Sequence, residues 1–153
     1  MKMVPTLYLA NTLGFTAYGQ KHLDKYIVPR LEKLGYDVIE PFTRNKLLLE
    51  ECSGKELAFL IGQSNKDSID KCDTLVAILD GTDIDSGVAS EIGYAYARPG
   101  LIINGYRNNF RRAPDNEGIC DINLQIQYFI ENSCGKIYSD FNKLIKGLKS
   151  EGI

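Results

Sequence analysis

Short apolar runs recur along the chain, and longer stretches with helical spacing separate them. The clearest run, Leu75–Leu79, has no polar position and stops at Asp80-Gly81. A continuous apolar run that ends in a turn signal is typical of a strand buried on both faces. Four other runs also fit strands, so the sequence predicts five: Thr6–Ala10, Tyr36–Glu40, Leu75–Leu79, Leu101–Ile103 and Lys136–Tyr138.

The stretches between these runs predict helices. In Ala17–Leu34, apolar residues recur every three or four positions, at Leu23, Ile27, Leu31 and Leu34. Such spacing gives a helix one apolar face. Further helices are expected over Asn45–Gly62 with a break at Ser53-Gly54, over Gln63–Lys71, from near Gly87, over Asp121–Glu131 and over Asp140–Lys149.

Three expectations concern the second half of the chain. Asn104-Gly105 is a strong turn signal and predicts the end of the fourth strand. The polar stretch from Tyr106 to Gly118 has the composition of an exposed loop, which could act as a mobile lid. In the helix after it, Leu124, Tyr128 and Ile130 are expected to face inward.

Strands that alternate with helices predict an α/β fold with a parallel sheet. We expect one domain over residues 1–153, with a flavodoxin-like, doubly wound, five-stranded parallel sheet in the order 2-1-3-4-5 and helices on both faces. This order puts the topological switch point between the first and third strands. Tyr8 and Glu91 would therefore meet near the carboxyl ends of adjacent strands.

Composition narrows the class of protein. The 153 residues are 44% hydrophobic and 25% charged, with a net charge of −2 and no basic block, which argues against binding a nucleic-acid polymer. No apolar run reaches the length of a membrane span or forms a signal peptide, so a cytoplasmic location is expected. His22 is the only histidine and the four cysteines form no CxxC pair, so neither a metal nor another cofactor is expected.

Glu91 is the first candidate for chemistry. The helix that begins near Gly87 would bury Val88, Ile92 and Ala95 and would place Glu91 in its first or second turn. The positive end of a helix favours an ionised carboxylate, and the crevice beyond the strand ends is the usual ligand site of such sheets. Glu91 could thus act as a nucleophile or base, or could simply complement the helix dipole on the surface.

Several motifs, in a fixed order, resemble the nucleoside 2-deoxyribosyltransferase family. The likeness spans most of the chain, from the first strand to a late asparagine. The residues that carry it are Leu7-Tyr8-Leu9-Ala10, Asp80-Gly81, Asp85-Ser86-Gly87, Glu91-Ile92-Gly93-Tyr94-Ala95 and Asn123-Leu124.

The resemblance implies a role for four residues. Glu91 would attack the anomeric carbon of the sugar, and the Tyr8 hydroxyl would orient Glu91. Asp85 would bind sugar hydroxyls. Asn123 would do so from a neighbouring subunit, which implies a homo-oligomer, a dimer or an assembly of dimers, with shared active sites. The structural alternatives are a core aromatic for Tyr8, a helix N-cap for Asp85 and a turn or cap for Asn123.

The resemblance also touches four residues whose roles stay open. Phe15 would stack on the base, although a core role fits equally well. Gly87 would permit close packing of loop and helix. Where family members often carry an aspartate that assists the leaving base, this chain has Asn65, with Asp67 close by. An asparagine cannot deliver a proton, so either Asp67 takes that role or base exchange differs.

The resemblance implies base exchange between 2′-deoxynucleosides and free nucleobases, by ping-pong covalent catalysis with retained configuration. The alternatives are hydrolysis of 2′-deoxynucleosides or their 5′-monophosphates, and a non-catalytic nucleotide-binding module. Asp85 would repel a phosphate, whereas the cluster from Arg107 to Arg112 could bind one.

Overall fold

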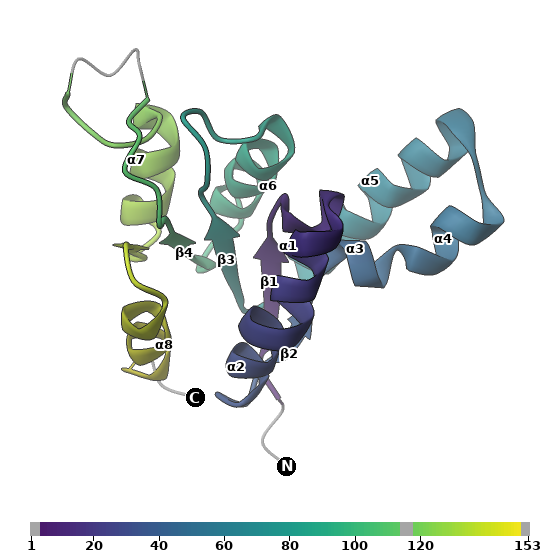
Figure 1. Cartoon of the computed structure of the whole chain (residues 1–153), viewed down its shortest axis with the longest axis horizontal. Helices are drawn as coiled ribbons and strands as arrows, with labels where there is room; N and C mark the ends of the chain where they lie inside the picture. Colours follow the sequence, from purple (N-terminus) through teal and green to yellow (C-terminus); the bar gives the residue numbers. More distant parts are fainter. Residues whose placement is uncertain (1–3, 114–117, 151–153) are drawn as a thin grey trace.

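The computed structural model of the chain describes residues 4–113 and 118–150. Its centre is a five-stranded parallel sheet with the order β2-β1-β3-β4-β5, as the sequence predicts (Figure 1). The strands are β1 Thr6–Ala10, β2 Asp37–Ile39, β3 Thr74–Ile78, β4 Ile102–Tyr106 and β5 Ile137–Tyr138.

Helices cover both faces of the sheet, which confirms the doubly wound architecture. Alternate residues of β1 face opposite sides of the sheet. Leu7 and Leu9 pack with η2 (Leu23–Ile27), α2 (Val28–Glu32) and α8 (Phe141–Ser150). Tyr8 and Ala10 pack with α5 (Gly54–Lys71), α6 (Ser86–Tyr96) and α7 (Leu124–Asn132). The helical segments are η1 Leu13–Phe15, α1 Ala17–His22, η2 Leu23–Ile27, α2 Val28–Glu32, α3 Pro41–Arg44, α4 Lys46–Glu51, α5 Gly54–Lys71, α6 Ser86–Tyr96, α7 Leu124–Asn132 and α8 Phe141–Ser150.

Residues 17–32 form one continuous helix with a π-helical turn in its middle, η2. The wider turn ends at Ile27, two residues before Pro29, which has no N–H to donate and whose ring would clash with the carbonyl one turn back. Leu23, Ile27 and Leu31 are buried as predicted, and Leu34 is half-buried. The apolar stripe therefore survives the change in helical pitch.

The turn expected at Asn104-Gly105 is wrong, because β4 continues through both residues to Tyr106. The Oδ1 atom of Asn104 accepts a hydrogen bond from the backbone N–H of Lys136 at 3.0 Å. A Cβ atom on Gly105 would lie 2.5 Å from Leu79 Cδ1, so the glycine permits close packing rather than a turn. Burial in a parallel sheet overrides the local preference.

The inward face of α7 also differs from the expectation. Ile126 and Ile130 are buried, whereas Leu124 and Tyr128 are 48% and 52% exposed. Both pairs have the four-residue spacing of a helical stripe, so spacing alone could not choose between them. Of the three residues expected inside, only Ile130 is confirmed.

The helices α4 and α5 form an arm that stands out from the body of the molecule in Figure 1. No residue of α4 is buried, and Leu47, Leu49 and Phe59 expose more than half of their surface. The arm bends at Cys52 and Ser53, next to the break that the sequence predicts. No helix in the described part of the chain is long and apolar enough to cross a membrane.

Candidate active site

Asp85 begins α6 and fixes the backbone at the start of the helix. Its Oδ1 atom accepts hydrogen bonds from the backbone N–H groups of Gly87 at 2.8 Å and Val88 at 3.1 Å. This is the N-cap role that the sequence left open. A Cβ atom on Gly87 would lie 2.9 Å from the same oxygen, which explains a glycine there. The carboxyl group is thereby held at the carboxyl end of β3.

Glu91 lies in the second turn of α6, and its carboxylate meets the first strand. The Tyr8 hydroxyl donates a hydrogen bond to Glu91 Oε1 at 2.7 Å, across 83 residues of sequence. Tyr8 is fully buried, so its ring holds the hydroxyl rigidly against the carboxylate. The contact expected from the strand order is therefore present.

Burial, rather than the helix dipole, controls the ionisation of Glu91. Removal from water, aided by the charge of Asp85 and opposed by the Tyr8 hydrogen bond, raises the pKa of Glu91 to about 7. The expectation that the helix start holds this group ionised is wrong, because the dipole acts within the first turn only. Burial and the Glu91 charge raise the pKa of Tyr8, so its hydroxyl stays a donor.

Asn65 of α5 contacts the same carboxylate. Its Nδ2 atom donates to Glu91 Oε1 at 3.4 Å, and its Oδ1 atom accepts from Asn45 Nδ2 at 2.8 Å. Tyr8 and Asn65 therefore both act on Oε1. Among the described residues no hydrogen bond engages Oε2, so this oxygen is available to a ligand.

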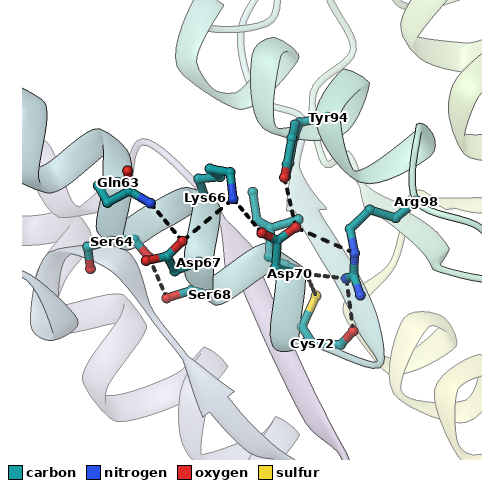
Figure 2. A network of polar contacts seen from close by, with 10 residues as sticks. Gln63, Ser64, Lys66, Asp67, Ser68, Asp70, Cys72, Tyr94 and Arg98 are labelled. Carbon is teal, nitrogen blue, oxygen red and sulfur yellow. Dashed lines mark hydrogen bonds and ion pairs between the residues drawn. The ribbon is translucent and has the colours of Figure 1, made fainter.

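Asp67 does not reach the site. Residues two apart on a helix point to different sides, so Asn65 faces Glu91 while Asp67 faces away. The Asp67 carboxylate accepts from Gln63 Nε2 at 2.8 Å and lies 3.6 Å from Lys66 Nζ (Figure 2). The structure thus contradicts the placement of Asp67 beside a leaving base.

A cavity of about 480 Å³ adjoins Glu91. Much of its wall is formed by the segments that come directly after β1, β2 and β3 in the sequence. This is the switch point of the sheet, where ligands bind in such folds. A nucleoside fits such a volume. The described residues that line the cavity are Asn11, Gly14, Phe15, Gln20, Pro41, Phe42, Asn45, Leu49, Ile61, Asn65, Asp85, Gly87, Val88 and Glu91.

Two aromatic rings form part of the cavity wall. Phe15 is 73% exposed, so the alternative of a core role is wrong. Its ring meets the edge of Phe42 with the centroids 4.8 Å apart. Together the rings offer an apolar surface for a flat ligand.

Sequence reasoning missed several lining residues. Asn11 directly follows β1, and that position at a strand end was a usable signal. Phe42 lies on α3 and Asn45 lies at the junction of α3 and α4, and no motif marked either residue. Their place in the wall depends on how α3 folds back toward β1.

Asn123 lies outside this cavity. It is the N-cap of α7, and its Oδ1 atom accepts from the backbone N–H groups of Gln125 at 3.0 Å and Ile126 at 3.3 Å. It is not part of the described wall around Glu91. A role for Asn123 in a site shared between subunits remains a prediction.

Arg107 has a structural role in the loop after β4. It is 5% exposed, and its Nη1 atom donates to the carbonyls of Leu79 at 2.6 Å and Gly81 at 3.0 Å. Its Nη2 atom donates to the carbonyl of Arg111. Arg112 pairs with Asp121 at 2.9 Å on the surface. Neither Arg107 nor Arg112 lines the cavity beside Glu91.

A polar network joins α5 to α6 and so fixes Asn65 relative to Glu91 (Figure 2). The centre is Asp70, which contacts Lys66 Nζ at 2.6 Å, the Tyr94 hydroxyl at 2.8 Å and Arg98 Nε at 3.7 Å. Arg98 also donates to the carbonyls of Ile69 and Cys72 at the end of α5. Hydrogen bonds from Lys66 and Tyr94 hold the pKa of Asp70 below its usual value.

The fold and the site together define a flavodoxin-like α/β protein. At the switch point of its sheet, a carboxylate that accepts a hydrogen bond from a tyrosine hydroxyl lies beside a cavity. The sequence model of the nucleoside 2-deoxyribosyltransferase family matches residues 7–147. The chain therefore belongs to this family. No curated protein sequence matches the chain.

Solved structures share the fold. The 2-deoxyribosyltransferase of Bacillus psychrosaccharolyticus is 24% identical over 92% of this chain and 90% of that chain, with a TM-score of 0.68. The 2-desoxiribosyltransferase of Leishmania mexicana is 19% identical over 97% and 99%, with a TM-score of 0.70. The CMP N-glycosidase of Clostridium botulinum is 19% identical over 96% and 99%, with a TM-score of 0.59.

Proposed function

We propose that the protein transfers the 2-deoxyribosyl group between nucleobases through a covalent bond to Glu91. The observation that carries the proposal is the contact between the Tyr8 hydroxyl and Glu91 Oε1, beside a cavity at the switch point. This contact anchors one carboxylate oxygen and leaves Oε2 to meet the substrate. The family match and the two transferases with the same fold support the same activity.

The chemistry follows from the carboxylate. As the N-glycosidic bond breaks, positive charge develops on the sugar ring, and the negative charge of Glu91 stabilises it. Oε2 then bonds to the anomeric carbon, and the base leaves with the bonding electron pair. A second base attacks the same carbon and releases Glu91. Two inversions retain the configuration, as in retaining glycosidases.

The leaving base needs a proton that Asn65 cannot supply, since an amide only donates or accepts hydrogen bonds. Among the described wall residues, Asp85 and Glu91 are the carboxylic acids. We therefore expect faster exchange of bases that leave readily without a proton from the enzyme.

The charges at the cavity favour unphosphorylated nucleosides. No lysine or arginine lines the described wall, whereas Asp85 does. A phosphate there would meet a negative charge without a cation to bind it. The monophosphates are thus expected to be poor substrates.

The test is an incubation with deoxyinosine and free adenine, followed by chromatography of the products. We expect deoxyadenosine from the wild type and none from Glu91→Gln, which keeps the size of the side chain. Asp67→Ala is the matched control, because it removes a carboxylate outside the cavity and should leave the rate unchanged. Free deoxyribose as the main product would mean hydrolysis instead. Full activity in Glu91→Gln would contradict the proposal.

A further inference from the structure

Three side chains form a polar chain that runs from the junction of α3 and α4 to the carboxylate of Glu91. Asn45 Nδ2 donates to Asn65 Oδ1 at 2.8 Å, and Asn65 Nδ2 lies 3.4 Å from Glu91 Oε1. Asn45 is 4% exposed, whereas Asn65 is only half-buried. The inner amide is thus better fixed than the one that touches Glu91.

The direction of these hydrogen bonds follows from the carboxylate. An ionised carboxylate only accepts, so Asn65 must turn its NH₂ group toward Glu91 and its oxygen toward Asn45. Asn45 must then donate, which leaves its own Oδ1 atom buried without a partner among the described residues. An unpaired buried acceptor is unfavourable for folding, so stability alone does not account for this arrangement.

We propose that Asn45 is a positioning residue that fixes the orientation of the Asn65 amide, so that Asn65 presents its NH₂ group to Glu91. The proposal rests on the function proposed above, in which Glu91 must be ionised to attack. Without Asn45 the Asn65 amide can rotate, and the contact of 3.4 Å with Glu91 weakens. A weaker contact stabilises the carboxylate less and favours its protonated form.

Few other groups act on Glu91. Tyr8 faces it from β1, and Asp85 faces it from the start of α6. Glu40, at the start of α3, acts on Tyr8 rather than on Glu91 itself. From α5 the neutral Asn65 makes the contact, so a change at Asn45 reaches Glu91 through Asn65.

We call the path from Asn45 through Asn65 to Glu91 the relay. Two measurements test it: titration of the Glu91 carboxyl by ¹³C NMR in the free enzyme, and the pH profile of kcat/KM. Asn45→Leu should move the titration midpoint and the acid limb upward by about half a pH unit. Asn45→Asp should move both further, because an aspartate accepts from Asn65 and turns its oxygen toward Glu91. Asn142→Leu, on the surface of α8, is the control and should shift neither.

A double-mutant cycle tests whether Asn45 acts on Glu91 only through Asn65. Asn65→Leu should give the same upward shift as Asn45→Leu, and the double variant should shift no further than Asn65→Leu alone. A shift that Asn45→Leu still adds in the Asn65→Leu protein would overturn the relay, and so would an unchanged midpoint in Asn45→Leu. If Asn45→Leu does not fold, the near-isosteric Asn45→Asp decides, and an unchanged midpoint there refutes the proposal.

The failure of the relay and the failure of the proposed function are distinguishable. If the wild type exchanges bases but Asn45→Leu leaves the Glu91 titration midpoint unchanged, the role of Asn45 is rejected and the proposed transferase function stands. Absence of both exchange and hydrolysis rejects the function, while the NMR titration still decides whether Asn45 acts on Glu91.

Discussion

At Glu91, burial and hydrogen bonding act in opposite directions on a single carboxyl group. Burial raises its pKa to about 7, while the Tyr8 hydroxyl favours the charged form. Near neutral pH the group is therefore divided between the acid and the carboxylate. Since only the carboxylate attacks, kcat/KM should rise with pH through about 7.

The same shift predicts a cost in stability. The folded-state pKa of Glu91, about 7, exceeds its usual value of 4.5, so its stabilising contribution is present below pH 4.5 and is lost as the pH rises through 7. Glu91→Gln avoids this loss. Relative to the wild type, its free energy of unfolding should increase by about 2–3 kcal/mol between pH 4.5 and about pH 8.

Urea denaturation of both proteins across this pH range measures the effect. Groups that the two proteins share cancel in the difference, so the pH dependence of the difference belongs to position 91. A difference in unfolding free energy that stays constant with pH would show that burial does not raise the pKa of Glu91.

At the scale of elements, α6 and α5 bring Glu91 and Asn65 together, and β1 supplies Tyr8. The network around Asp70 joins the two helices on their outer side (Figure 2). Surface ion pairs contribute little stability individually. Here the contacts of Asp70 link α5, which carries Asn65, to α6, which carries Glu91.

Much of this arrangement was predictable from sequence patterns. Alternating strands and helices predict the parallel sheet, and the flavodoxin-like strand order expected for it places Tyr8 beside Glu91. The pattern failed where local signals and packing disagree. Asn104-Gly105 resembles a turn in isolation but lies in a buried strand, where the missing side chain of Gly105 makes room for Leu79.

The candidate site was predictable only in part. Glu91, Asp85 and Gly87 lie on one strand–helix unit, so sequence spacing places them together. Phe42 on α3 and Asn45 at the junction of α3 and α4 also line the wall, and the direction of their side chains depends on tertiary packing. Asp67 was misplaced because proximity in sequence says little about the side of a helix.

At the scale of the whole molecule, the cavity is lined by the segments that follow β1, β2 and β3 and by α5. Asn123 lies on α7, outside the described wall. If Asn123 binds sugar hydroxyls, as the family resemblance implies, it does so in a neighbouring copy of the chain. We therefore expect an oligomer in which each active site draws on two subunits.

Two variants separate this role from capping. Asn123→Ala removes both the cap of α7 and the amide and should cost about 1 kcal/mol of stability, whereas Asn123→Ser keeps a capping side chain. Both should raise KM about tenfold, which corresponds to a lost hydrogen bond. Mixing the Asn123→Ser and Glu91→Gln proteins should restore some activity. In a mixed oligomer, a site can combine Glu91 from one variant with Asn123 from the other. Unchanged KM in both variants would contradict the shared site.

The covalent step is the centre of the account, and peptide-mapping mass spectrometry tests it directly. The protein is mixed with deoxyinosine, quenched in acid, digested and mapped. We predict a mass increase of one 2-deoxyribosyl group on the peptide that contains Glu91, and its loss when adenine is added before the quench. A turning-over enzyme that carries the sugar on another residue, or on none, would contradict the account.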